Sequence, residues 1–333
     1  NRIFIRLGDV NVITLAGTGE RDYYGDGLRG DLAAFNRPAG VAMSLERMPI
    51  RLSNDPVVVN EGGLRSTVFP RYIYVADTGN HVVRRIELEG EQGCCNRDGN
   101  FEVYMNPVGN HVVTTVIGTG EPGINTWRDD ASAFQLDSPA GIAALSNGHL
   151  LVSDTKNHRI VEYDPDTGVV TTVLGRVIEA AGEYFSEPGH TNGASANHPL
   201  NVSDDPDSPP ANTVRMNAPH ALTALPMQTI DPLGSGDIVF FADRGNQRAR
   251  VYLAGDFNAA GTNLGELVAD IAGSGTRGYS GDEGPANQAN LEYPQAVMPH
   301  VDGSCLASGE TGGDCAPKVL IAEGPDRVRI VSL

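Results

Sequence analysis

The fold is decided by residues 72–88, YIYVADTGNHVVRRIEL, which return as residues 149–164, HLLVSDTKNHRIVEYD, and as residues 238–253, IVFFADRGNQRARVYL. Each copy holds two short apolar runs separated by an acid and a polar turn. A shorter copy with a different turn, VLIAEGPDRVRIVSL, occupies residues 319–333. Apolar residues that alternate with polar ones at period 2 indicate half-buried strands. The stretch therefore predicts a recurring β-hairpin.

Two further elements flank the hairpins. An apolar run that opens with a proline precedes each one, at Pro38, Pro139, Pro219 and Pro294. Strands that end in small residues are VVTTVIGTG from Val112, VVTTVLG from Val169, LVADIAGSG from Leu267 and NVITLAGTG from Asn11. Each unit thus has four strands, named a to d in chain order. Radially repeated four-stranded antiparallel units that cover one another's faces form a β-propeller, so we predict an all-β propeller with four recognisable blades.

The repeats predict a single domain over residues 1–333. Its blade units fall roughly at residues 35–118, 134–175, 216–273 and 291–333, with residues 1–17 as closing strands and residues 176–215 as an insertion. An N-terminal strand that completes the last blade would close the ring and remove its free sheet edges. However, NRIFIRL at the N-terminus and RVRIVSL at the C-terminus both look like strand c. Either one blade has an extra strand, or the chain is part of a longer propeller.

The hairpin turn resembles the signature of the NHL-repeat family, which is named for Asn-His-Leu. The matching tripeptides are Asn80-His81-Val82 and Asn157-His158-Arg159, with Asn246-Gln247-Arg248 as a weaker copy. The last unit departs from the pattern with Gly324-Pro325-Asp326-Arg327. The Gly-rich loops that begin at Tyr23 and Gly278 look like the inter-blade loops of bacterial NHL arrays. The resemblance implies a propeller over nearly the whole chain, but a fold does not determine an activity.

Most of the repeat residues are expected to serve the fold. Asp77, Asp154 and Asp243 end strand b just before the turn. A carboxylate at that point can accept hydrogen bonds from turn amides. Gly79 and Gly245 suit a left-handed turn conformation, which glycine adopts without steric cost.

Charge and hydropathy exclude two classes of partner. The formal net charge is -18 and the sequence pI is near 4.7. Such a chain repels phosphate backbones, and nucleic-acid binding needs a basic footprint. Apolar runs also fall short of the ~18 residues that a membrane-spanning helix requires. We therefore expect neither a nucleic-acid partner nor a membrane span.

The four cysteines are Cys94, Cys95, Cys305 and Cys315. Their spacing, without nearby histidines, does not match a zinc site. We predict two disulfides formed in an oxidising compartment, with free thiols as the alternative. The predicted c–d and a–b loops that carry the cysteines share one face, so the disulfides could join blades. Because disulfides form in oxidising compartments, we predict that the protein is extracellular, on the cell surface or periplasmic.

Similar propellers that are enzymes, including amidating lyases and lactonase or strictosidine-type relatives, carry their chemistry at the channel end of strand a. The corresponding residues here, directly after each proline, are Ala39, Ala140, His220 and Gln295. Two alanines and one histidine cannot form a three-ligand zinc site by themselves. His190 or His198 of the insertion could add ligands. We predict His220, Gln295 and Trp127 as binding residues at the channel mouth.

Carboxylates on Gly-rich loops are the second kind of candidate site. The residues are Asp22, Asp26, Asp31, Asp129, Asp130 and Asp282. Clustered oxygen ligands on such loops suit calcium, although none of the loops has the EF-hand spacing. Calcium is therefore the one cofactor that the residues suggest, and structural roles for these acids are the alternative.

The favoured function is a binding scaffold for a protein partner or for self-assembly, with a glycan as a possible ligand, because loop-lined propeller faces carry recognition residues. Trp127, the only tryptophan, lies in a d–a loop and could anchor an interface or pack beneath that loop. A structural subunit of an extracellular assembly is a second hypothesis. A metal-dependent hydrolase or lyase with a site near His220 is the third.

Overall fold

The computed structural model describes residues 1–7, 11–44, 71–88, 111–180, 183–187, 214–226, 236–254, 258–259, 262–263, 267–300 and 318–332. Strands dominate this part of the chain, and its only helical elements are short 3-10 turns. Cys94, Cys95, Cys305, Cys315, His190 and His198 lie outside the described residues. The predicted disulfides and the additional metal ligands therefore stay predictions.

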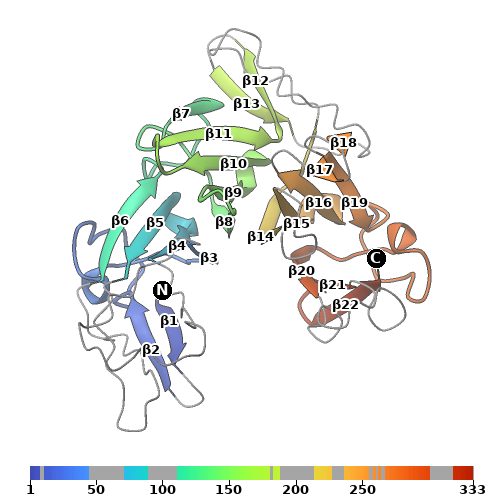
Figure 1. Cartoon of the computed structure of the whole chain (residues 1–333), viewed down its shortest axis with the longest axis horizontal. Coiled ribbons are helices and arrows are strands. Elements are labelled where there is room, and N and C mark those ends of the chain that lie inside the picture. The colour runs from blue at the N-terminus through green and yellow to red at the C-terminus, as the bar shows by residue number, and fades with distance from the viewer. Residues whose placement is uncertain are drawn as a thin grey trace, which may run out of the picture.

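Four antiparallel sheets form the blades in the predicted a–b–c–d order, which makes the chain an all-β propeller (Figure 1). Blade 1 consists of β3 (Gly40–Met43), β4 (Tyr72–Asp77), β5 (Val82–Glu87) and β6 (Val112–Ile117). Blade 2 consists of β8 (Pro139–Ala144), β9 (Leu150–Asp154), β10 (Arg159–Asp164) and β11 (Val169–Leu174). Blade 3 consists of β14 (Pro219–Pro226), β15 (Asp237–Asp243), β16 (Arg248–Ala254) and β19 (Leu267–Ala272). Blade 4 consists of β20 (Pro294–His300), β21 (Lys318–Glu323) and β22 (Arg327–Ser332).

The remaining strands lie outside these sheets or at their edges. β7 (Arg128–Asp130) pairs with β11 and adds a fifth, outermost strand to blade 2. Three two-stranded hairpins are β1 (Ile3–Leu7) with β2 (Asn11–Ala16), β12 (Arg176–Ala180) with β13 (Glu183–Glu187), and β17 (Asn258–Ala259) with β18 (Thr262–Asn263). The insertion predicted at residues 176–215 thus begins with the β12–β13 hairpin.

The described N-terminal strands do not pair with blade 4. Among the described residues, β1 and β2 make a sheet of their own, and blade 4 has three strands that neither β1 nor β2 joins. In Figure 1 the blades follow one another along an arc, and β1–β2 and β20–β22 lie apart at its two ends. The prediction that the N-terminal strands complete the last blade is therefore wrong.

The hydrophobic core consists of layers between neighbouring blades. One layer joins side chains of blade 1, such as Val83 and Ile117, to Ile142 and Val152 of blade 2. Corresponding layers lie between blades 2 and 3, between blades 3 and 4, and between the β1–β2 hairpin and blade 1. Each blade therefore buries its faces only because its neighbours cover them, as expected for a repeat architecture.

A buried acid at the end of strand b connects the turn to the loop before strand a. In blade 2, Asp154 Oδ1 accepts the Asp137 N–H at 2.7 Å, and Oδ2 accepts bonds from Asn157 Nδ2 and Arg159 Nε, both at 2.8 Å. Asp77, Asp243 and, in blade 4, Glu323 accept the corresponding backbone N–H. The predicted acceptor role is confirmed, but the amide belongs to the loop before strand a. Burial raises the pKa of both Asp77 and Asp243 to about 6, against the opposing effect of hydrogen bonds and of Arg84 and Arg250.

The residue after each signature asparagine connects one blade to the next. Its backbone is left-handed, and its side chain accepts the N–H of the residue that precedes the next proline. The bonds are His81 Nδ1 to Ser138 at 3.1 Å, His158 Nδ1 to Ala218 at 3.0 Å and Gln247 Oε1 to Tyr293 at 2.7 Å. The histidine of the signature is thus an inter-blade hydrogen-bond acceptor.

Asn1 occupies the same position in front of blade 1. Its Oδ1 accepts the N–H of Arg37, the residue before Pro38, at 2.9 Å. A Cβ at Gly17 would lie 2.4 Å from the Asn1 carbonyl oxygen, as one at Gly118 would lie 2.7 Å from that of His81. β1 and β2 are therefore strands c and d of a further blade, as the appearance of NRIFIRL suggested.

The prediction for Gly79 and Gly245 is wrong, because neither adopts a left-handed conformation. Close packing explains why glycine occupies these two positions. A Cβ at Gly79 would lie 2.6 Å from Asn36 Cγ, and one at Gly245 would lie 2.4 Å from Asn217 Cγ. Blade 2 has Lys156 at this position, and its Nζ lies 3.3 Å from Asp137, the counterpart of Asn36.

Candidate functional site

A pocket of about 560 Å³ lies where the b–c turns of blades 1 to 3 meet residues at or just before the start of strand a from all four blades. Blades 1 and 2 contribute their 3-10 turns, η3 (Thr78–Asn80) and η4 (Thr155–Asn157), and blade 3 contributes the start of η6 (Arg244–Asn246). His220 and Gln295 come from the second positions of β14 and β20. We call this the mouth pocket.

The mouth pocket is locally basic although the chain is acidic. Arg37, Lys156 and Arg244 line it together with His81 and His220, and no carboxylate is among its lining residues. Among the described residues, neither Arg37 nor Arg244 pairs with a carboxylate, while Lys156 Nζ lies 3.3 Å from Asp137. The Arg244 guanidinium stacks over the Tyr293 ring at 4.9 Å. Arg37 and Arg244 are therefore cations without acidic partners among the described residues, and such cations in a concave site favour an anion.

His220 and Gln295 are brought together, as their positions after the prolines suggested. His220 Nδ1 lies 3.1 Å from the backbone carbonyl oxygen of Gln295. The Gln295 side chain donates from Nε2 to the Gly324 carbonyl oxygen at 2.9 Å. Burial lowers the pKa of His220, and the nearby Arg244 lowers it further, against the bond to Gln295. The ring is therefore neutral at neutral pH, with its proton on Nδ1, and its Nε2 can accept a hydrogen bond from a ligand.

Two glycines set the spacing of the innermost strands beneath the pocket. A Cβ at Gly40 would lie 2.2 Å from the Ala140 carbonyl oxygen, and one at Gly141 would lie 2.3 Å from that of His220. Both contacts are with the backbone of the next blade, so a side chain could not be accommodated by a rotamer change. The positions of Ala140 and His220 in the mouth therefore depend on close approach at glycine.

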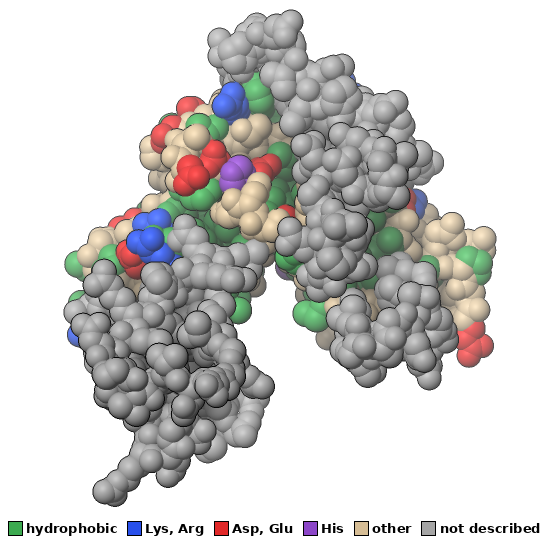
Figure 2. All heavy atoms as spheres, in the orientation of Figure 1, with side chains coloured by type: hydrophobic (Ala, Val, Ile, Leu, Met, Phe, Trp, Pro, Cys, Tyr) green, Lys and Arg blue, Asp and Glu red, His purple; other side chains and the backbone are tan. Residues whose placement is uncertain are grey.

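The opposite ends of the strands carry a different charge. His149, in the a–b turn of blade 2, lies 2.7 Å from Glu162 and 3.6 Å from Asp164. Figure 2 shows acidic side chains gathered over this blade on the face in view. The basic mouth pocket is therefore a local feature and does not reflect the overall charge of the chain.

Trp127 does not belong to the mouth pocket. It is 5% exposed and lies directly before β7, at the outer edge of blade 2, where its carbonyl oxygen accepts the Thr172 N–H at 2.8 Å. Of the two roles considered for it, an exposed anchor is wrong, and packing beneath the loop is what the structure shows.

The acidic calcium candidates have structural partners in the described residues. Asp26 binds Arg84 at 2.7 Å, Asp31 binds Arg29 at 2.6 Å, and Asp282 binds Arg329 at 2.6 Å. The side chains of Asp22, Asp129 and Asp130 accept N–H groups of their own loops. No group of three His, Cys, Asp or Glu side chains in the described part of the chain could hold a metal ion. The structure therefore does not bring these acids together as a calcium site.

The basic residues of the mouth were missed by sequence reasoning. Arg37 directly precedes Pro38, and Lys156 and Arg244 lie in the turns beside the signature asparagines. Their positions within the repeat could have predicted the site, because residues next to the prolines and in the b–c turns all lie at one end of the channel. That convergence became apparent only once the register of the blades was known.

The fold and this mouth define a β-propeller whose four-stranded blades meet through their innermost strands. The NHL repeat matches residues 136–163, and these residues span β8, β9 and most of β10 in blade 2. The match identifies an NHL repeat in blade 2, and the same construction recurs in the other blades of the propeller, which confirms the resemblance. No curated protein sequence matches the chain significantly.

Several solved structures are similar at low identity. Auxiliary nutrient binding proteins from Bacteroides ovatus and Bacteroides thetaiotaomicron match with 10% and 14% identity and TM-scores of 0.36 and 0.37. The matches cover 79% and 93% of this chain and 52% and 73% of theirs. A gluconolactonase from Xanthomonas campestris matches with 11% identity and a TM-score of 0.33, over 92% of this chain and 63% of its own. This chain thus spans about half the length of the first of these structures, and scores this low carry no argument about its ligand.

No helix in the described ranges is long and apolar enough to cross a membrane.

Proposed function

We propose that this chain is a binding propeller that acts outside the cytoplasm, on the cell surface or in the periplasm, and holds an anionic group of its partner in the mouth pocket. The observation that carries the proposal is the gathering of Arg37, Lys156, Arg244 and His220 in one concave site with no lining carboxylate. A volume of about 560 Å³ lies within the range of roughly 300–1,000 Å³ typical of small-molecule sites. The anion could be a carboxylate of a small molecule or of a protein side chain.

Binding is favoured over catalysis by the composition of the pocket. Its described lining offers one neutral imidazole at His220 and a second, His81, whose Nδ1 already accepts the Ser138 N–H. It offers no carboxylate to act as a general base and no set of three metal ligands. The hydrolase or lyase hypothesis would require ligands from outside the described residues, so we do not favour it.

The first test is binding of sulfate, an anion whose charge does not change between pH 5 and 8. We expect saturable binding by isothermal titration calorimetry, and binding at least about tenfold weaker in the double variant Lys156→Ala with Arg244→Ala, because two charge-assisted contacts are removed. Arg128→Ala, at an exposed position of β7, is the matched control and should leave the affinity unchanged. Equal affinity in the double variant would contradict the proposal. D-glucuronate and glucose, used as a charged and a neutral sugar probe, then show whether a carboxylate is required.

The affinity for sulfate should increase as the pH falls below the ordinary imidazole range, about pH 6.5. Burial keeps the pKa of His220 below its usual value, so the ring gains its proton only at acidic pH and then adds a positive charge to the pocket. The measurement is a titration series from pH 7.5 to pH 5. His220→Gln should remove most of the pH dependence, which separates the contribution of His220 from that of His81. If His220→Gln shows the same pH profile as the unmodified chain, another group causes the pH dependence and this prediction is contradicted.

A further inference from the structure

The mouth pocket offers uncharged hydrogen-bond acceptors as well as cations. Two of them belong to neighbouring blades, on His220 of β14 and Gln295 of β20. A carbonyl oxygen only accepts, so the side-chain nitrogen that faces one must carry a proton. His220 Nδ1 therefore donates to the Gln295 carbonyl oxygen, and Gln295 Nε2 donates to that of Gly324. The remaining polar atoms, His220 Nε2 and Gln295 Oε1, are acceptors without a hydrogen-bond partner among the described residues.

The hydroxyl groups that line the pocket have already donated their protons to the protein. Thr155 Oγ1 donates to the Pro219 carbonyl oxygen at 2.8 Å, and Ser138 Oγ donates to Asp137 Oδ1 at 2.9 Å. Thr78 Oγ1 makes a longer bond, of 3.4 Å, to a backbone carbonyl oxygen of its own blade. Each hydroxyl has one proton, so these oxygens can only accept a bond from a ligand. The hydroxyl groups therefore add to the acceptors of the pocket.

The donors of the pocket are the cations and a second histidine. His81 Nδ1 accepts the Ser138 N–H at 3.1 Å, so the neutral His81 ring carries its proton on Nε2. His81 and His220 thus line one pocket in opposite tautomers, and Nε2 donates in the first and accepts in the second. Together with Arg37, Lys156 and Arg244, the pocket has positively charged donors for an anion and uncharged acceptors for a different group.

The uncharged acceptors decide which anions fit. Acetate or sulfate has no proton to donate to His220 Nε2 or Gln295 Oε1, and an acceptor that loses its water without a new bond costs free energy. A hydroxyl of the ligand supplies that proton without adding charge. An ammonium group could donate as well, but no carboxylate is among the described lining residues, and Arg37 and Arg244 would repel it. The matching group is therefore a hydroxyl.

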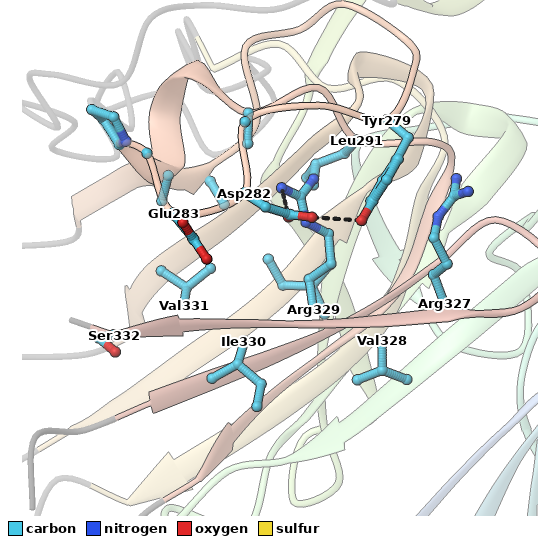
Figure 3. Close-up of a pocket in the computed structure, with 17 residues that line it drawn as sticks. Tyr279, Asp282, Glu283, Leu291, Arg327, Val328, Arg329, Ile330, Val331 and Ser332 are labelled. Carbon is cyan, nitrogen blue, oxygen red and sulfur yellow. Dashed lines mark hydrogen bonds and ion pairs between the residues drawn. The ribbon is translucent and has the colours of Figure 1, made fainter. Parts of the chain in front are cut away.

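A second hollow, of about 780 Å³ between β22 and the loop of residues 278–291, shows the contrast (Figure 3). There the polar side chains bond to one another. Tyr279 Oη donates to Asp282 Oδ2 at 2.5 Å, and Arg329 donates to Asp282 Oδ1 at 2.6 Å. A phenol and a guanidinium are thus both directed at one carboxylate of the protein. In the mouth pocket, the acceptors of His220 and Gln295 stay open to a ligand.

We propose that the mouth pocket binds a hydroxycarboxylic acid, whose carboxylate lies among Arg37, Lys156 and Arg244 and whose hydroxyl groups donate to His220 Nε2 and Gln295 Oε1. This inference rests on the proposed function, which requires only an anion, and adds the acceptors that select among anions. Beyond the effect of burial, the charge of Arg244 lowers the pKa of His220, so the two side chains lie near each other. A carboxylate and a hydroxyl on adjacent carbon atoms can therefore reach both.

The test compares four three-carbon acids on the whole 333-residue chain by isothermal titration calorimetry, at pH 7.5 and constant ionic strength. Racemic glycerate, racemic lactate and propionate carry two, one and no hydroxyl groups, and L-alanine carries an ammonium group. We expect lactate to bind roughly threefold to tenfold more tightly than propionate, and glycerate more tightly than lactate, because each hydroxyl fills an acceptor. Alanine should bind more weakly than lactate.

His220→Asn and His220→Gln form a matched pair of variants. Asparagine keeps an amide donor at the place of Nδ1 but has no atom at the place of Nε2, whereas the longer glutamine side chain reaches that place with an amide oxygen. His220→Asn should therefore abolish the preference for lactate over propionate, and His220→Gln should retain it. Thermal unfolding checks that both variants fold.

Sulfate binding, measured on the same protein, separates this inference from the proposed function. If sulfate binds but propionate or alanine binds as tightly as lactate, the inference is overturned and the proposed function stands. A preference for lactate that is the same in His220→Asn as in the unmodified chain would also overturn it, since another group would then accept the hydroxyl. If neither sulfate nor any of the acids binds, the proposed function itself fails.

Discussion

Replacing Asp154 by alanine is expected to lower the free energy of unfolding by about 3–5 kcal/mol, the cost of leaving one partner of a buried ion pair without the other. Asp154 and Arg159 are both 0% exposed, and their side chains meet at 2.8 Å. The same carboxylate also accepts the Asp137 N–H and an Asn157 Nδ2 bond. The variant would therefore leave the buried Arg159 charge without its carboxylate, and Arg159 Nε and the Asp137 N–H without their acceptor. Urea unfolding followed by circular dichroism measures the loss.

Asp129→Ala is the control for this effect. Asp129 is an exposed acid on β7 of the same blade, and its removal should change stability by no more than about 0.5 kcal/mol. A loss below about 1 kcal/mol in Asp154→Ala would show that the acid at the end of strand b does not hold the blade together. The same loss in both variants would point to net charge as the cause.

Gly141→Ala is expected to cost about 1–3 kcal/mol, the usual penalty for overpacking a tight contact. The added Cβ would lie 2.3 Å from the His220 carbonyl oxygen and 2.8 Å from the Leu222 nitrogen, so strands a of blades 2 and 3 must move apart. His220 moves with β14, and sulfate binding in the mouth pocket should weaken together with stability. Calorimetry on the folded variant separates the two effects.

Gly284→Ala serves as the comparison. The nearest atom to a Cβ at Gly284 would be the Gly281 carbonyl oxygen at 3.4 Å, which is an ordinary contact, and we expect a change within about 0.5 kcal/mol. If Gly141→Ala unfolds at the same urea concentration as the unmodified chain and binds sulfate equally well, close approach of the inner strands does not position the mouth.

Much of the fold could be predicted because each blade repeats a local pattern. Alternating apolar residues placed strands b and c, the prolines placed strand a, and the Asn-His pairs placed the turns between strands b and c. The left-handed residue was misassigned to Gly79 and Gly245, because glycine is the usual occupant of that conformation. In the structure, His81, His158 and Gln247 adopt it, since each side chain then reaches the next blade.

The mouth was only partly predictable. His220 and Gln295 followed from their place after the prolines, but Arg37, Lys156 and Arg244 are far apart in the sequence and each looks like a surface residue by itself. Trp127, in contrast, was predicted as a mouth residue and is not one. Its loop position suggested exposure, whereas Trp127 is 5% exposed and directly precedes β7 at the outer edge of blade 2.

The four repeats, the order of strands within each blade and the acid that ends strand b could all be predicted, because these features depend on residues close together in the chain. The basic character of the mouth pocket and the close approach of the inner strands at Gly40 and Gly141 became apparent only in the tertiary structure. Those features depend on how separate blades pack, and a period-2 pattern is the same whether or not a neighbouring strand lies beside it.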